Sequence, residues 1–268
     1  MAVSYQNWRG RLVEVPDETL AAVLSALGDD EPPGGSADPE VQAHALGGAV
    51  APFPARRSWG FAVQLYSVRS RASWGHGDLH DLADLAVWSG GELGADFVLV
   101  NPLHAAEPQP PVSPSPYLPM SRRQVSPLYL RVEDIPEYQR LSAGDRARVE
   151  ALAAPLRAAS TTAALIDRDA VWAAKRAALE LIRAVPLTVS RRAELDAFLA
   201  RDRRALDDWA TWCALAEMHG PDWRSWPAPL TDPGSAEVTE LRRALADRIE
   251  FHAWLQWLAA AARPRAAG

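Results

Sequence analysis

The chain has 268 residues, a length that suits one large domain or two smaller ones. Hydrophobic residues make up 48% and charged residues 23%, which excludes a disordered or collagen-like chain. The net charge of -6 and the lack of a long basic run argue against nucleic acid as a partner. The single cysteine, Cys213, excludes an intrachain disulfide framework and favours a reducing compartment.

The sequence also argues against a membrane location. The N-terminal stretch MAVSYQNWRGRLVEVPDE lacks the apolar core of a signal peptide, and no run of about 18 apolar residues occurs. We therefore expect a cytoplasmic protein without a membrane partner.

The first two zones of the chain differ in composition. Residues 1–28 read as a short structured piece, in which an apolar helical pattern opens at Asp17 and ends at Gly28. Residues 29–57 are dense in proline, glycine and acidic residues, and their lack of periodicity predicts a flexible linker.

Residues 58–138 carry two strand-like runs separated by a helical pattern. The first run lies at residues 61–66, and the second, 97–100, is apolar on both faces, as in strands that helices cover on both sides. Asp78 suits the N-cap of the intervening helix, which ends near Gly94. Strand, helix and strand in this order predict a βαβ unit with parallel strands.

Residues 139–268 have an almost wholly helical pattern. Prolines separate the apolar periodic segments, and no further strand of the same quality follows. The segments lie around Leu152 and at residues 171–182, 195–218 and 241–258. The predicted class is therefore α/β, although a parallel sheet of two strands is not a finished domain.

A proline-rich loop follows the second strand, and this end of a parallel sheet is where α/β proteins bind ligands. Asn101 and His104 lie at the end of the strand, and Ser115 and Tyr117 lie within the loop. A tyrosine held by flanking prolines offers a flat face and a hydroxyl group, which suits a sugar. These four residues are the candidate binding groups, with structural packing of Tyr117 as the alternative.

Other constellations give weaker signals. His76, Asp78, His80 and Asp81 resemble a metal cluster, but flanking glycines place His76 ahead of the helix and leave too few ligands. No GxSxG elbow, GxxxxGK loop or GxGxxG fingerprint occurs. We expect no metal and no nucleotide cofactor, and Cys213 fits the core better than a catalytic thiol.

Residues 58–138 resemble a known family. The motifs QLYS, WGxGD, NPLH and SPY occur in the order and spacing of the bacterial 4-alpha-glucanotransferases, or amylomaltases, of glycoside hydrolase family 77. Residues 1–28 resemble the end of an N-terminal module of longer members, and the helical zone resembles the helical region of the family. The resemblance implies the first two strands of a (β/α)8 TIM barrel with a large helical insertion, incomplete as given.

The resemblance also implies an activity. Members transfer α-1,4-glucan segments between maltooligosaccharides by a retaining route with a covalent glycosyl intermediate, without a metal or nucleotide cofactor. Ser115 and Tyr117 fall on the SPY motif, which lines the donor side of the glucan groove. Asn101 and His104 fall on the strand-end motif beneath it.

The catalytic carboxylates of the family have no counterpart here. The family nucleophile lies in a strand-borne Arg-x-Asp motif, whereas the Arg-Ile-Glu triplet at Arg248 lies in a helical pattern. We therefore expect a truncated 4-alpha-glucanotransferase with no catalytic residue, inactive by itself. Two alternatives stay open: a non-catalytic α-glucan-binding remnant, and one half of a split enzyme whose protein partner is unknown.

Overall fold

The structure is a computed structural model that describes residues 4–6, 12–14, 16–19, 57–160, 162, 165–201 and 203–262. The chain divides into two compact units, Met1–Arg57 and Ser58–Gly268.

The first unit contains a short antiparallel strand pair. Strand β1 (Ser4–Gln6) pairs with β2 (Leu12–Glu14). Sequence patterns predict neither strand, because three residues are too few for an alternation to stand out. Most of the helix predicted to end at Gly28 and of the linker predicted at residues 29–57 lies outside the described residues.

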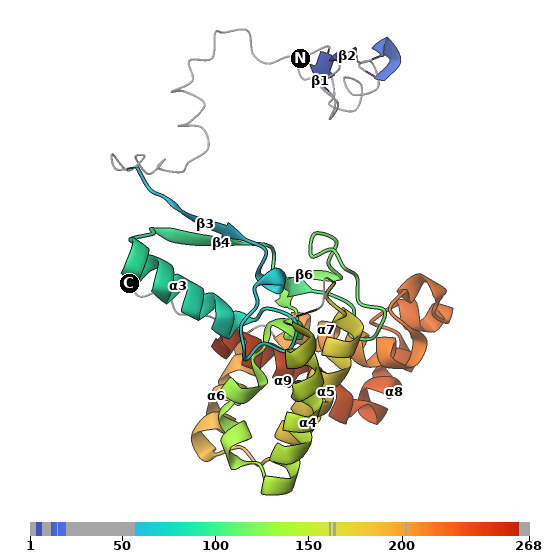
Figure 1. Cartoon of the computed structure of the whole chain (residues 1–268). Coiled ribbons are helices and arrows are strands. Elements are labelled where there is room, and N and C mark those ends of the chain that lie inside the picture. Colours follow the sequence, from blue (N-terminus) through green and yellow to red (C-terminus); the bar gives the residue numbers. More distant parts are fainter. Residues whose placement is uncertain are drawn as a thin grey trace. The chain divides into compact units, whose positions relative to one another are not determined.

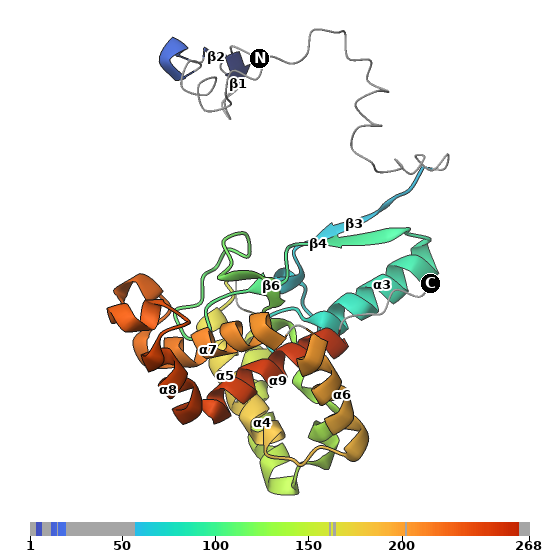
Figure 2. The same cartoon turned by 180° about the vertical axis from the view of Figure 1, so that it is seen from behind.

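The second unit combines two small sheets with a group of helices, seen from opposite sides in Figures 1 and 2. The strands are β3 (Gly60–Val63), β4 (Phe97–Val100), β5 (His104–Ala105) and β6 (Ser121–Val125). The helices are α3 (Leu79–Leu93), α4 (Ala143–Ser160), α5 (Arg168–Arg183), α6 (Val189–Arg201), α7 (Arg203–His219), α8 (Ala236–Ala244) and α9 (Ala246–Ala262).

The βαβ unit of β3, α3 and β4 confirms the prediction from the sequence. The two strands pair in parallel, with Phe61 opposite Val98. Helix α3 begins after Asp78, whose side chain accepts hydrogen bonds from the backbone N–H groups of His80 and Asp81. It ends at Gly94, whose φ of 68° lies in the left-handed region that glycine adopts without strain.

The first strand is shorter than predicted. Strand β3 ends at Val63, and the chain then forms a 3₁₀ turn, Leu65–Ser67. The backbone N–H of Leu65 donates to the side chain of Asn101 at 2.7 Å, so the chain leaves the sheet at this point. Leu65 is fully buried against Leu79 and Tyr129. The sequence around Leu65 is therefore apolar because the turn is packed in the core, and not because the strand continues.

The outer face of this sheet is open in the described part of the chain, contrary to the expected cover on both faces. Phe97 and Leu99 on β4 share this face and are 49% and 62% exposed. Strand β4 pairs with β3 alone among the described strands, so its second edge is unpaired. In Figure 1 the two strands and α3 extend away from the group formed by α4 to α9.

The helical zone is confirmed, with two corrections. The predicted segments 195–218 and 241–258 are each two helices, α6 with α7 and α8 with α9. Helix α9 contacts α7, α6 and β6, and it lies in the middle of the group in Figure 2. Its residues from Phe251 to Ala259 are all buried, as expected for a helix that is apolar on most sides. Cys213 on α7 is buried, as predicted.

Within the described ranges, none of the helices has the length and apolar character that crossing a bilayer requires.

The open edge and apolar face of β4 should make the chain self-associate. Leu99→Lys places a charge on a side chain that is 62% exposed, so it should reduce association. The free energy of unfolding should change by less than about 0.5 kcal/mol, because a surface side chain loses few contacts. Sedimentation velocity over a concentration series measures the association.

Val189→Lys is the matched control, because Val189 is 89% exposed but lies on α6 instead of the sheet. It should leave the association unchanged. A wild-type chain that stays monomeric at every concentration contradicts this prediction.

Candidate functional site

A buried ion cluster fixes the start of α3. The guanidinium of Arg131 donates to Asp78 at 2.5 and 3.0 Å and to Asp81 at 2.7 Å. All three side chains are buried. The carboxylates that looked like metal ligands in the sequence therefore cap a helix and neutralise an arginine, and no group suited to a metal ion occurs among the described residues.

Lys175 connects the helical region to the segment that carries Arg131. Its ammonium group is completely buried and donates to the backbone carbonyls of Leu128 at 2.6 Å and Leu130 at 2.8 Å. Burial lowers the pKa of Lys175, while the negative charge of Asp78 opposes this shift. Helix α5 is thereby tied to the segment that follows β6.

Helix α5 also holds the proline-rich loop, here defined as residues 106–120. The indole N–H of Trp172 donates to the carbonyl of Pro108 at 2.8 Å. The carboxylate of Asp169 accepts the backbone N–H of Val112 at 2.7 Å. Because β5 and β6 pair at the two ends of the loop, it is fixed both at its base and along its length.

Asn101 orders the end of β4 from beneath. Its amide oxygen accepts the N–H of Leu65, and its amide nitrogen donates to the hydroxyl of Tyr129 at 2.9 Å. The side chain is buried, and both of its polar ends are used within the protein. Asn101 therefore positions the strand end, and its predicted contact with a ligand stays a prediction.

Tyr117 and Ser115 lie at the surface of the loop. Tyr117 is 55% exposed, so the alternative of a packed core tyrosine is wrong. Its hydroxyl lies 3.1 Å from the amide nitrogen of Gln64, at the end of β3, which donates to it. The backbone N–H of Tyr117 donates to the hydroxyl of Ser115 at 3.4 Å. The loop therefore presents an aromatic ring above the carboxyl end of β3.

A recess of about 30 Å³ lies behind this loop. It brings His104 and Ser115 together, whereas Asn101 and Tyr117 are not among its lining residues. No aspartate or glutamate in the described part of the chain lines it. Side chains from distant parts of the chain complete its wall, namely Tyr66, His76, Tyr129 and Arg168.

His76 is a neutral histidine in the wall of the recess. Its ring lies 5.1 Å from that of Tyr129, and its Nδ1 lies 2.9 Å from the carbonyl of Gly77. A carbonyl only accepts, so Nδ1 carries the hydrogen and Nε2 is left as an acceptor. Burial lowers the pKa of His76 to about 3, and the positive charges of Lys175 and Arg168 add to this effect.

Four residues of this wall are not predicted as binding groups from the sequence, namely Tyr66, His76, Tyr129 and Arg168. His76 lies at the variable position of WGxGD, where the flanking glycines were the available signal for a close approach of the chain. Arg168 directly follows Asp167, the N-cap of α5. No local pattern distinguishes Arg168 from the other arginines, because its neighbours in the recess lie far away in the sequence.

The Arg-Ile-Glu triplet lies within α9, as predicted. Arg248 donates to both oxygens of Glu217, at 2.8 and 2.6 Å, and to Glu180 at 2.5 Å. Burial raises the pKa of Glu217, but hydrogen bonds from His252 and Arg248 outweigh it and lower the pKa to about 2. A carboxylate held in this way is part of a structural ion network.

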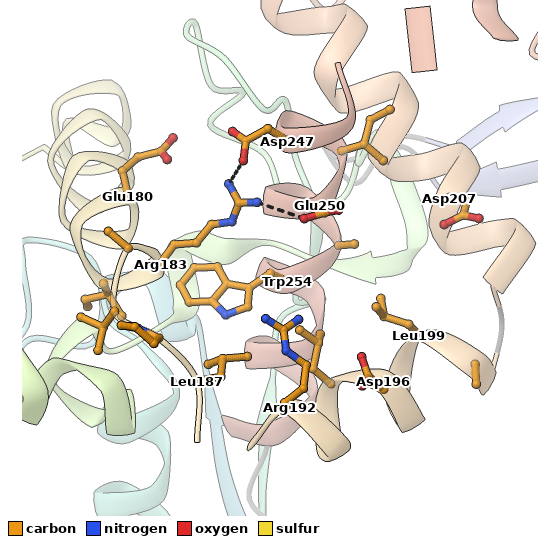
Figure 3. A pocket seen from close by; sticks show the side chains of 18 of the residues that line it. Glu180, Arg183, Leu187, Arg192, Asp196, Leu199, Asp207, Asp247, Glu250 and Trp254 are labelled. Atoms are coloured by element: carbon orange, nitrogen blue, oxygen red, sulfur yellow. Dashed lines mark hydrogen bonds and ion pairs between the residues drawn. The ribbon is translucent and has the colours of Figure 1, made fainter. Parts of the chain in front are cut away.

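A larger cleft of about 910 Å³ lies between α5, α6, α7 and α9 (Figure 3). Arg183 reaches across it to Asp247 at 2.8 Å and to Glu250 at 3.5 Å. Trp254 is buried, so its ring offers no stacking face. The cleft therefore lacks the exposed aromatic ring and the proline-rich loop found beside the recess.

The pKa of His76 predicts a loss of stability in acid. The folded protein keeps this ring neutral down to about pH 3, whereas the unfolded chain binds a proton below about pH 6.5. The free energy of unfolding should therefore fall as the pH decreases through this window, by up to about 1.4 kcal/mol per pH unit from this group. Denaturant titrations at pH 7, 6 and 5 measure this dependence. The free energy of unfolding should fall less steeply with decreasing pH in His76→Gln than in the wild type.

His80→Gln is the matched control and should act in the opposite direction. A hydrogen bond to Asp134 raises the pKa of His80, so the folded state gains stability when this ring becomes protonated. In His80→Gln the free energy of unfolding should therefore fall more steeply with decreasing pH than in the wild type. Equal slopes in the wild type and His76→Gln would show that His76 is not held neutral.

The comparisons with known proteins identify the family. Residues 63–266 match the family model described as 4-alpha-glucanotransferase. A 4-alpha-glucanotransferase of Mycobacterium tuberculosis is 55% identical over 208 residues, covering 75% of this chain and 28% of the relative. One from Haemophilus influenzae is 32% identical over 222 residues, covering 76% of this chain and 31% of the relative. The chain thus spans less than a third of these relatives.

Solved structures agree with this assignment. The amylomaltase from Corynebacterium glutamicum superposes with a TM-score of 0.65 at 41% identity, covering 77% of this chain and 27% of that one. The amylomaltase from Streptococcus agalactiae in complex with acarbose has the same fold, with a TM-score of 0.58 at 17% identity over 77% of this chain and 39% of that one. This chain belongs to the 4-alpha-glucanotransferase family.

Proposed function

We propose that this chain is the glucan-binding front part of a 4-alpha-glucanotransferase that acts in the cytoplasm. In this proposal, β3 and β4 are the first two strands of a (β/α)8 barrel, and residues 139–268 are a helical insertion. Residues 1–28 are the remnant of an N-terminal module, and residues 29–57 are a linker. The parallel pairing of β3 and β4 and the second edge of β4, which no described strand pairs with, support a sheet that continues with further strands.

The proposed ligand is an α-1,4-glucan lying along the proline-rich loop. The exposed ring of Tyr117 carries this proposal, since an aromatic face packs against the apolar face of a sugar. Ser115 and His104 add polar groups at the adjacent recess, and Asn101 keeps the strand end beneath them in place. The sugar analogue acarbose in the Streptococcus agalactiae enzyme is consistent with a carbohydrate ligand.

The proposed reaction is retaining transfer of a glucan segment through a covalent glycosyl intermediate. It requires two carboxyl groups about 5–5.5 Å apart on either side of the glycosidic bond. The described wall of the recess has no carboxylate, and the carboxylates around Arg248 serve an ion network. We therefore assign substrate binding to the described part of this chain, and the nucleophile and the acid to the remainder of a full-length enzyme.

Maltoheptaose should bind to this chain in a saturable way, and Tyr117→Ala should weaken the binding about fivefold, because one aromatic contact contributes about 1 kcal/mol. Isothermal titration calorimetry measures the dissociation constants. Tyr117→Phe is the matched control, since it keeps the ring and loses only the hydroxyl contact with Gln64. Equal affinity of Tyr117→Ala and wild type would remove Tyr117 from the site.

The chain alone should not disproportionate maltotriose into glucose and longer oligomers. The described residues that line the recess include no carboxylate that could act as the nucleophile or the acid. Chromatography of the products after incubation with pure protein measures this. A full-length relative with the catalytic carboxylates serves as the positive control. Glucose release by the pure chain would place a nucleophile within it and contradict the division of labour proposed here.

A further inference from the structure

Arg168 differs from the other partly buried arginines in the part of the chain that the structure describes. Each of the others has a carboxylate oxygen within 4.0 Å, and Arg168 has none. The paired arginines are Arg131, Arg157, Arg176, Arg183, Arg191, Arg242 and Arg248. A partly desolvated guanidinium without a counterion is costly unless another acceptor meets its N–H groups.

The neighbouring carboxylates are already engaged with backbone groups. Asp167 accepts the N–H of Ala170 at 2.9 Å as the cap of α5. Asp169 accepts the N–H of Val112 and so holds the proline-rich loop. Among the described residues, no carboxylate lies within 4.0 Å of the guanidinium of Arg168. Its positive charge lies beside the recess, where it adds to the lowering of the pKa of His76 and opposes the rise that burial causes in the pKa of Tyr129.

The position of the guanidinium is fixed by an aromatic ring. Its central carbon lies 5.0 Å from the ring centroid of Tyr66, a contact of the cation–π type. Arginine has five N–H donors and no acceptor, and a guanidinium held against a ring keeps the donors at its edge available. Arg168 thus lines the recess, and no described residue accepts a hydrogen bond from its guanidinium.

The recess is small and has hydrogen-bond donors and acceptors in its wall. A volume of about 30 Å³ accommodates a group of the size of one water molecule or hydroxyl. His76 lines the recess, and its Nε2 is an acceptor because Nδ1 carries the hydrogen. Ser115 also lines the recess, and its hydroxyl both donates and accepts. A hydroxyl group in the recess can accept a hydrogen bond from the guanidinium of Arg168 and donate one to Nε2 of His76, so that both side chains gain a partner.

We propose that Arg168 is a glucan-contacting residue, supplied by the helical region, whose guanidinium donates hydrogen bonds to hydroxyl oxygens of a glucose unit lying against Ser115 and His104. One hydroxyl of that unit enters the recess and donates to Nε2 of His76. This inference rests on the proposed function and deepens it, because it gives the helical region a direct part in substrate binding.

The test compares two variants of Arg168 by calorimetric titration with maltoheptaose. Arg168→Met keeps an unbranched apolar stem and removes all donors, so the dissociation constant should rise about tenfold, as for a lost charged hydrogen bond of about 1.5 kcal/mol. Arg168→Lys keeps the charge but not the planar fork, and its affinity should lie between those of wild type and Arg168→Met. Arg243→Met, at an exposed position on α8, is the control and should bind like wild type.

Thermal unfolding of each variant separates binding from folding. A purely structural role for Arg168 would lower the melting temperature and leave the dissociation constant unchanged, and this result would overturn the inference. If Arg168→Met binds like wild type while Tyr117→Ala is weakened, the inference fails and the proposed function stands. If the wild-type chain shows no saturable binding of maltoheptaose, both fail together.

Discussion

The arrangement of the whole site depends on the neutralisation of Arg131. Its guanidinium meets Asp78 and Asp81 in a buried space, and these same carboxylates cap α3. Removing one partner from such a buried pair leaves an uncompensated charge, at a cost of about 3–5 kcal/mol. Lys175 lies close to the cluster and holds the backbone of Leu128 and Leu130. The βαβ unit and the helical region are therefore both tied to the segment after β6, and residues of all three line the recess.

Local chemistry explains which parts of the fold can be predicted from the sequence. Strand β4 and helix α3 are marked by their own residues, by Asp78 at the start of the helix and by Gly94 at its end. The turn at Leu65 cannot be found in this way, because it depends on a hydrogen bond that Leu65 donates to Asn101, which is distant in the sequence. The split between α8 and α9 at Leu245 was missed for another reason, since no proline or glycine marks it.

The SPY and NPLH motifs predict only the part of the candidate site that their own residues form. Tyr117 and Ser115 lie together on the loop, and His104 shares the recess with Ser115. The motifs do not show that Asn101 faces the protein interior, nor that His76 and Arg168 join the wall. Those facts depend on tertiary contacts, of Asn101 with Leu65 and Tyr129 and of α5 with the loop, between residues that a linear pattern cannot relate.

The hydrogen bonds from α5 to the loop also limit how this enzyme family can be recombined. Because Asp169 and Trp172 hold the backbone at Val112 and Pro108, the shape of the loop does not depend on its own sequence alone. A loop transplanted from a relative would arrive without the helix that shapes it. The loop and the first turns of α5 form one inherited unit, although Val112 and Asp169 lie 57 positions apart in the sequence. A functional chimera therefore has to exchange both.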